Sequence, residues 1–302
     1  MGVIYVSMSD VNADWVDATV PGRGVMLAAR DYGGAGRAVV LIHGGPGQNL
    51  ATWDSFVPHL GGRVRAVALD IRGNGASDDA GDYSGAALAS DVAAIATHYA
   101  LERPVVVGHS WGGQIAVAYA AGHTNCAGIV CVDGWVADAH ARLTDDTWRR
   151  AEEMYRADPY FSFAGDREQV DAFIAEMRIE FGDSGAAVAF RQLCQDEDGI
   201  WRMRRTVDQL LAIEKKVDDA EPLTSEVYAR VKCPVLFIGG EHSERERGTE
   251  WGPWAFSRAA TEPIDQRCDH IECEWWPCGH DIPHLMLERL AERIVAFANG
   301  VS

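Results

Sequence analysis

PVVVGHSWGG, residues 104–113, joins an apolar, β-branched run to a Gly-x-Ser-x-Gly motif. The valines predict a buried strand and the pattern from Gln114 onward predicts a helix, so the motif lies in a very tight turn. Gly108 and Gly112 occupy positions where a side chain would block the close approach of strand and helix. Ser110 is then exposed near the first free N–H groups of the helix, where developing negative charge is stabilised. We therefore take Ser110 as the candidate acyl-transfer nucleophile; a glycine-rich turn without chemistry is the alternative.

Similar strand–loop units flank this motif along the chain. Apolar runs over residues 38–43, 64–70 and 128–132 predict buried strands, and helical spacing over 86–101 and 114–121 separates them. This alternation predicts an α/β fold with a mainly parallel central sheet and helices on both faces. Ligands bind at the carboxyl ends of such strands. Four residues at these ends therefore mark the expected site: His43, Asp70, Ser110 and Asp133.

The pattern changes after the strand that precedes Asp133. Between residues 137 and 220 we expect no strand, and helical patterns cover residues 147–157, 167–181, 186–195 and 200–217. This block is rich in aromatic residues, a few of which should line an apolar pocket. We interpret residues 137–220 as a helical cap, or lid, on a core domain formed by residues 1–136 and 221–302. Strands are expected again at residues 233–240 and 271–276.

Composition narrows the class of partner. The 302 residues include 27 Lys and Arg against 45 Asp and Glu, which gives a formal net charge of −18. This charge would repel a nucleic acid or an anionic membrane, so we expect neither as a partner. No stretch approaches the ~20 apolar residues that span a bilayer, and residues 1–14 lack the pattern of a signal peptide. The sequence leaves the oligomeric state open.

Seven scattered cysteines predict reduced thiols in a cytoplasmic protein rather than a disulfide framework. Four residues could be arranged as a set of zinc ligands, although no tight Cys-x-x-Cys pair supports such a site: Cys268, His270, Cys278 and His280. We therefore expect no metal and no organic cofactor.

Four motifs in a fixed order resemble those of the α/β-hydrolase family: His43-Gly44-Gly45-Pro46-Gly47, the loop DIRGNGAS at residues 70–77, Gly108 to Gly113, and GHDIPHL at residues 279–285. The resemblance covers roughly residues 25–298. It implies a nucleophile at Ser110, a general base at His280, and a helical lid after the Asp133 strand. It also implies an oxyanion hole formed by the backbone N–H groups of Gly45 and Trp111. The HGGPG and GHSWGG motifs are locally similar to those of proline iminopeptidases.

The acid of the catalytic triad is the open question. In this family it usually lies a few residues past the strand that follows the lid, where this chain has Ser243. Asp133 is the first substitute, because haloalkane dehalogenases and some lactonases of this fold resemble this chain in placing their acid there. Glu244 and Glu241 are the alternatives, and a site without an acid is the third option. We expect Asp70 to form a salt bridge with the nearby Arg72 instead.

Together these residues predict a serine hydrolase. His280 would take the proton of Ser110, which would attack a carbonyl and form an acyl-enzyme. The aromatic lid favours a carboxylic ester or a lactone of an apolar or aromatic small molecule. An aminopeptidase similar to proline iminopeptidases is the enzymatic alternative, and a small-molecule receptor with slow or no turnover is the alternative of another class. The serine argues against dehalogenase and epoxide-hydrolase chemistry, because such enzymes of this fold use Asp there.

Overall fold

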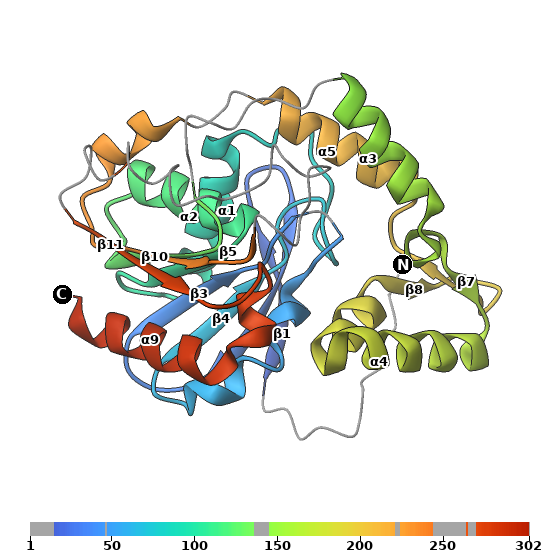
Figure 1. The fold of residues 1–302 in the computed structure, drawn as a ribbon, viewed down its shortest axis with the longest axis horizontal. Coiled ribbons are helices and arrows are strands. Elements are labelled where there is room, and N and C mark those ends of the chain that lie inside the picture. The colour runs from blue at the N-terminus through green and yellow to red at the C-terminus, as the bar shows by residue number, and fades with distance from the viewer. Residues whose placement is uncertain are drawn as a thin grey trace.

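A computed structural model describes residues 15–45, 47–135, 145–220, 224–243, 264 and 270–301 of the chain. An eight-stranded sheet forms its centre, in the order β1-β2-β4-β3-β5-β6-β10-β11 (Figure 1). Antiparallel pairing joins β1 to β2 and β2 to β4, and the other neighbours are parallel, which confirms the predicted sheet. The strands are β1 (Val16–Pro21), β2 (Met26–Gly33), β3 (Ala38–Ile42), β4 (Arg65–Leu69), β5 (Val105–His109), β6 (Gly128–Val132), β10 (Val235–Gly240) and β11 (Ile271–Trp276).

Helices cover both faces of the sheet, as the alternating pattern predicts (Figure 1). On one face lie α1 (Gly85–His98) and α2 (Trp111–Gly122); on the other lie α9 (Leu287–Gly300) and the 3-10 helices η1 (Leu50–Trp53) and η2 (Val57–Leu60). Successive strand residues point to opposite faces and so enter two separate apolar cores. In β5, Val106 packs on the side of α1 and α2, whereas Val105 and Val107 pack on the side of α9.

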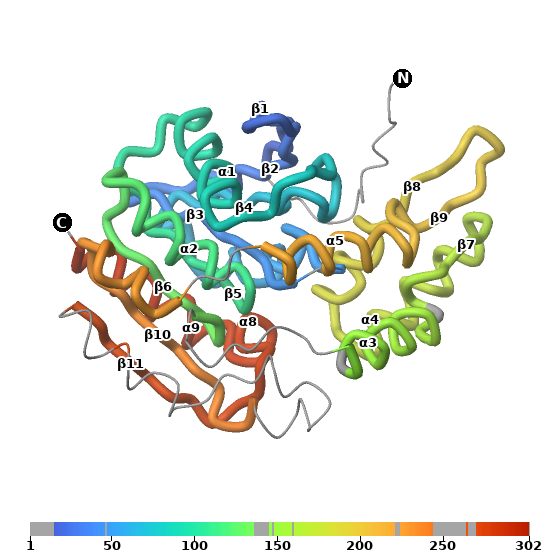
Figure 2. The backbone as a smooth tube through the Cα atoms, turned by 90° about the horizontal axis from the view of Figure 1, so that it is seen from above, coloured from blue at the N-terminus to red at the C-terminus, as the bar shows by residue number. Residues whose placement is uncertain are grey.

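Residues 145–220 form a group of elements of their own beside the sheet (Figures 1 and 2). They comprise α3 (Asp145–Ala157), η3 (Pro159–Ser162), α4 (Arg167–Arg191) and α5 (Val207–Asp219), with an apolar cluster that includes Phe173 and Trp201. The expectation that this region contains no strand was wrong. Three short strands form an antiparallel sheet in the order β7-β9-β8: β7 (Ala164–Gly165), β8 (Leu193–Gln195) and β9 (Trp201–Met203).

A tight turn explains why the helix predicted over residues 200–217 is shorter. The side chain of Asp196 accepts the backbone N–H groups of Asp198 at 3.1 Å and Ile200 at 2.9 Å. Gly199 has a φ of +82°, a conformation that glycine adopts without steric cost. The chain therefore reverses direction between β8 and β9, and α5 begins only at Val207.

The helices predicted over residues 167–181 and 186–195 form one element, α4, which ends at Arg191. A kink at Gly182, with a φ of 72°, separates its two halves. Asp166 caps the start of this helix, since its side chain accepts the N–H of Gln169 at 3.0 Å.

Two short helices complete the described elements, η4 (Ser225–Arg230) and α8 (Ile282–Leu285). Within the residues that the structure describes, no helix is long and apolar enough to cross a bilayer. Cys126, Cys131, Cys194 and Cys233 are free thiols. Residues 136–144 and 221–223, at the borders of the expected cap, lie outside the described residues.

Candidate active site

Ser110 lies at the turn between β5 and α2, where the sequence motif places it. Its backbone has a φ of 54° and a ψ of −121°, which is strained for a residue with a side chain. Glycines allow the backbone to come this close. A Cβ on Gly108 would lie 2.0 Å from the carbonyl oxygen of Gly112, and a Cβ on Gly112 would lie 2.5 Å from that of His43. The packed backbone therefore holds Ser110 at the carboxyl end of β5.

Asp133 occupies the equivalent place on the neighbouring strand, directly after β6. A Cβ on the next residue, Gly134, would lie 1.9 Å from the carbonyl oxygen of Ser110, so the two turns are in contact. The carboxylate of Asp133 is fully buried. Its Oδ1 accepts the backbone N–H of Gly240, at the end of β10, at a distance of 2.9 Å. Asp133 is thus held between the serine turn and the next strand of the sheet.

His280 follows β11 and brings its ring to this buried carboxylate. The Nδ1 atom of His280 lies 2.5 Å from Oδ2 of Asp133. A carboxylate only accepts hydrogen bonds, so Nδ1 carries the proton, and a neutral ring then keeps its lone pair on Nε2. This is the tautomer that a general base needs to accept a proton from a serine hydroxyl. The geometry therefore brings together a histidine and an acid that lie 147 residues apart in the chain.

The other candidate acids lie at the end of β10 or beyond the described residues. Glu241 has an exposed side chain, and its backbone N–H donates to the carbonyl oxygen of Trp276 at 2.9 Å. Glu244 lies outside the described residues. Ser243, at the usual position of the acid, is fully buried, and its Oγ would lie 2.5 Å from a Cβ on Gly240. Ser243 therefore packs against the same turn that donates a hydrogen bond to Asp133.

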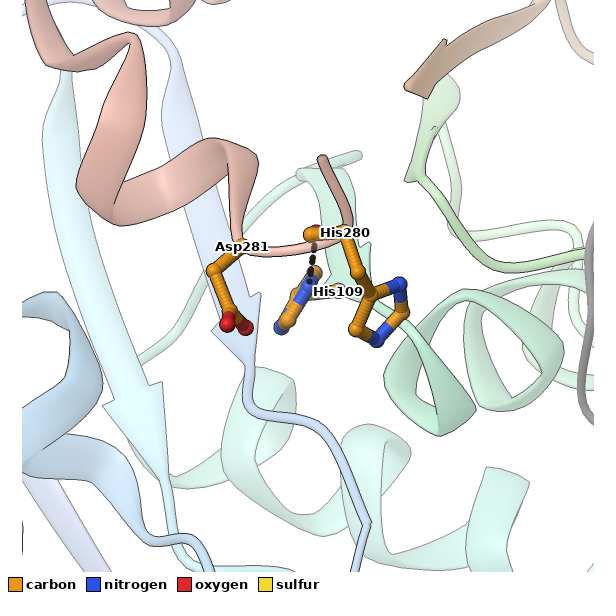
Figure 3. A group of neighbouring side chains, drawn as sticks. All are labelled: His109, His280 and Asp281. Atoms are coloured by element: carbon orange, nitrogen blue, oxygen red, sulfur yellow. Dashed lines mark hydrogen bonds between the residues drawn. The ribbon is translucent and has the colours of Figure 1, made fainter. Parts of the chain in front are cut away.

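His109, the residue before the candidate nucleophile, also contacts His280. The centres of the two rings are 4.7 Å apart. The Nε2 of His109 donates to the carbonyl oxygen of His280 at 3.0 Å (Figure 3). Because His109 is fully buried at the end of β5, this bond ties the loop that carries His280 to the serine strand.

One group of described residues could hold a metal ion. His109, His280 and Asp281 bring three potential ligand atoms within 4.8 Å of one another (Figure 3). A cation would have to take the second ring nitrogen of each histidine, because the first is hydrogen-bonded, and at His280 that second nitrogen is the proposed proton acceptor. Both histidine rings already take part in hydrogen bonds within the candidate site. The set of zinc ligands weighed from the sequence includes Cys268, which lies outside the described residues.

The loop after β3 carries the first candidate oxyanion donor. His43 is fully buried; its Nδ1 donates to the carbonyl oxygen of Gly44 at 2.9 Å, and its Nε2 accepts the N–H of Ile71 at 3.0 Å. Burial lowers the pKa of His43 to about 4, so this ring is neutral at pH 7. A Cβ on Gly45 would have no heavy atom within 4 Å, so the backbone at Gly45 borders open space. Trp111, the second candidate donor, is the first residue of α2, where N–H groups have no acceptor within the helix.

The expected salt bridge between Asp70 and Arg72 was wrong. The Nε and Nη2 atoms of Arg72 each lie 2.6 Å from a carboxylate oxygen of Asp91. Asp70 is fully buried and pairs instead with Arg191 at the end of α4, where Nη2 and Oδ2 are 2.9 Å apart. Nothing in the local sequence of either residue indicates this contact, because 121 residues separate the two.

Comparisons with known proteins agree with this architecture. The family model described as the alpha/beta hydrolase fold matches residues 37–181. The solved structure of an E-2-(acetamidomethylene)succinate hydrolase is similar, with a TM-score of 0.72 and 21% identity over 95% of this chain and 100% of that one. An enol-lactonase from Burkholderia xenovorans LB400 has a TM-score of 0.66 and 20% identity over 94% of this chain and 100% of that one. The chain has the α/β-hydrolase fold, as its four motifs predict.

Curated relatives match over parts of their length. An esterase of Mycobacterium tuberculosis is 34% identical over 121 residues, which are 39% of this chain and 40% of that protein. The chain spans only 26% to 30% of the length of other relatives, among them an uncharacterised mycobacterial protein and epoxide hydrolases.

Proposed function

We propose that this chain is a serine hydrolase that cleaves a carboxylic ester or a lactone of an apolar or aromatic small molecule. The observation that carries the proposal is the hydrogen bond from Nδ1 of His280 to the buried carboxylate of Asp133. The position of this pair supports the proposal, because the turn that carries Asp133 packs directly against the strained turn of Ser110. In this proposal Ser110 is the nucleophile, His280 the general base and Asp133 the acid of the triad.

The reaction follows from these roles. Nε2 of His280 takes the hydroxyl proton as Ser110 attacks the carbonyl carbon, and the carbonyl oxygen becomes an oxyanion between the N–H groups of Gly45 and Trp111. Losing one such donor typically costs about 3 kcal/mol of transition-state stabilisation. The imidazolium returns its proton to the leaving alkoxide, and an acyl-enzyme remains. A water molecule, deprotonated by His280, then hydrolyses the acyl group and restores Ser110.

The region beside the sheet supports an apolar substrate. We propose that residues 137–220 act as a cap over the carboxyl ends of the strands. Phe161 of η3 lies against the loop of the first candidate oxyanion donor, since a Cβ on Gly47 would be 3.1 Å from its ring. Tyr155 of α3 packs against Phe161, and the centres of the two rings are 4.8 Å apart. An apolar or aromatic group of a substrate could pack against the partly exposed ring of Phe161, which Tyr155 supports from behind.

A panel of small substrates tests the proposal. We expect hydrolysis of p-nitrophenyl butyrate, phenyl acetate or an aromatic γ-lactone, with kcat/KM at least 100-fold above that for proline p-nitroanilide. Ser110→Ala should remove this activity. Preference for the proline arylamide would instead identify an aminopeptidase similar to proline iminopeptidases. A receptor would give a different result. The wild type and Ser110→Ala would then bind an ester or lactone equally tightly, and neither protein would hydrolyse it.

A further inference from the structure

The inserted region contacts the loop that carries Gly45, here called the oxyanion loop (residues 43–50). Gln192, directly after α4, donates from Nε2 to the carbonyl oxygen of Gly47 at 2.8 Å. In return, Nδ2 of Asn49 donates to the carbonyl oxygen of Val188 in α4 at 3.0 Å. These two bonds join the end of α4 to the loop at positions two and four residues beyond Gly45.

A buried carboxylate holds the far end of the same loop. Oδ1 of Asp70 accepts the backbone N–H of Leu50 at 2.7 Å. The next residue after Asp70 is Ile71, whose N–H donates to His43 at the beginning of the loop. Both ends of the oxyanion loop are therefore bonded to the segment Asp70–Ile71, and Asp70 is itself fully buried.

Arg191 supplies the positive charge that this carboxylate needs. Its guanidinium donates to Oδ2 of Asp70 from Nη2 at 2.9 Å and from Nε at 3.3 Å. Burial alone would raise the pKa of Asp70. The nearby Arg191, His43 and the hydrogen bonds from backbone N–H groups together outweigh burial and hold this pKa below its usual value. An ionised carboxylate is the stronger acceptor for the N–H of Leu50. The last turn of α4 thus acts on the loop directly through Gln192 and indirectly through Arg191 and Asp70.

We propose that Arg191 and Gln192 are positioning residues for the oxyanion hole, so that the end of α4 holds the N–H of Gly45 in place for the transition state. This inference rests on the proposed serine-hydrolase function. Preorganised donors stabilise the transition state because they need not move as the oxyanion forms. A loosened loop should therefore slow the chemical step and leave the binding of the uncharged substrate nearly unchanged.

Arg205 offers a matched control within the chain. It also joins the inserted region to the core through buried carbonyl groups: Nε donates to Gly73 at 2.6 Å and Nη2 to Ser77 at 2.5 Å. These acceptors lie in the loop after β4, beyond its first two residues Asp70 and Ile71, and not in the oxyanion loop. A change at Arg205 therefore tests whether any weakened contact between the two regions has the same effect.

The experiment compares four variants with the wild type: Arg191→Gln, Arg191→Lys, Gln192→Ala and Arg205→Gln. The kcat and KM are measured with p-nitrophenyl butyrate, and the Ki with an aryl trifluoromethyl ketone. The Ser110 oxygen bonds to the ketone carbon, its proton passes to His280, and the carbonyl oxygen becomes an oxyanion in the hole. We expect Arg191→Gln to lower kcat by roughly 10- to 100-fold, with KM within about threefold, since complete loss of one donor costs about 10²- to 10³-fold.

The Ki of the ketone should rise by the same factor as kcat/KM falls, because the ketone mimics the transition state. Arg191→Lys should recover part of kcat, and Arg205→Gln should leave both constants within about threefold of the wild type. Gln192→Ala leaves no buried charge without a partner, so it keeps the test informative if Arg191→Gln fails to fold. We expect it to lower kcat by roughly 3- to 10-fold.

Two results would overturn the inference. Equal losses of kcat in Gln192→Ala and Arg205→Gln would mean that the contacts are merely structural. A rise in KM with kcat and the Ki of the ketone unchanged would mean that Arg191 and Gln192 act on substrate binding. Ser110→Ala, measured in parallel, separates these results from a failure of the proposed function: if Ser110→Ala is as active as the wild type, the serine mechanism itself is wrong.

Discussion

Asp133→Asn is expected to lower kcat by about 10⁴-fold in a protein that remains folded, which is the loss seen when the acid of a serine triad becomes an amide. The Oδ1 of Asn can still accept the N–H of Gly240, so the turn should keep its structure. The amide NH₂ would then face Nδ1 of His280, which must become the acceptor. The proton would move to Nε2, and His280 could no longer act as a base toward Ser110.

The matched controls for this change are Glu241→Gln and Glu244→Gln. Each removes one alternative acid, and we expect kcat within about threefold of the wild type for both, because the proposed triad does not use these carboxylates. Circular dichroism and thermal unfolding verify that each variant is folded. A loss smaller than tenfold for Asp133→Asn would remove Asp133 from the triad, and a large loss for Glu241→Gln or Glu244→Gln would identify the acid instead.

Gly108→Ala should destabilise the protein by about 3 kcal/mol or more, at the upper end of the cost of overpacking. Its Cβ would lie 2.0 Å from the carbonyl oxygen of Gly112 and 2.5 Å from the backbone nitrogen of Gly113. Both are backbone atoms in α2, so no side chain can move aside to relieve the contact. Strand and helix would have to separate, and the turn that holds Ser110 would change. Thermal unfolding should show a decrease in Tm of roughly 5–10 °C, together with a loss of esterase activity.

Gly122→Ala is the control, because Gly122 ends the same helix and a Cβ there would have no heavy atom within 4 Å. Alanine in a helix is favoured over glycine by roughly 0.5–1 kcal/mol, so the Tm should stay the same or rise slightly. If Gly108→Ala proved as stable and active as Gly122→Ala, the close packing of β5 against α2 would not be what fixes the serine turn.

The core of the fold could be predicted because its pattern is local. Continuous apolar runs such as residues 105–107 indicate strands buried on both faces, and the helical spacing between them implies parallel neighbours. The small sheet beside the core was missed because β7, β8 and β9 have two or three residues each. Such strands are too short to show alternation. The turn at residues 196–199 was a usable signal for them, since Asp and Gly are typical turn residues.

The candidate site also contains residues that the sequence could reveal and residues that it could not. Ser110 and His280 lie in motifs that can be recognised in the sequence. Asp133 was one of several candidate acids, placed first by the resemblance to haloalkane dehalogenases and some lactonases. Arg191 could not be found from the sequence. Its partner Asp70 lies 121 residues earlier, and an arginine near the end of a helix is usually explained by the helix dipole. Asp70 itself lies next to Arg72 in a short loop, and this proximity suggested a pair that the fold does not form, because Arg72 points to Asp91.

The measurement that tests the central claim most directly is reaction with a fluorophosphonate probe, followed by intact mass and peptide mapping. The account predicts one label per chain, at Ser110, and loss of labelling in His280→Ala, because only an activated hydroxyl displaces the fluoride at a useful rate. Labelling of a different serine, equal labelling of wild type and His280→Ala, or no labelling of a folded protein that hydrolyses esters would each contradict a nucleophilic Ser110 activated by His280.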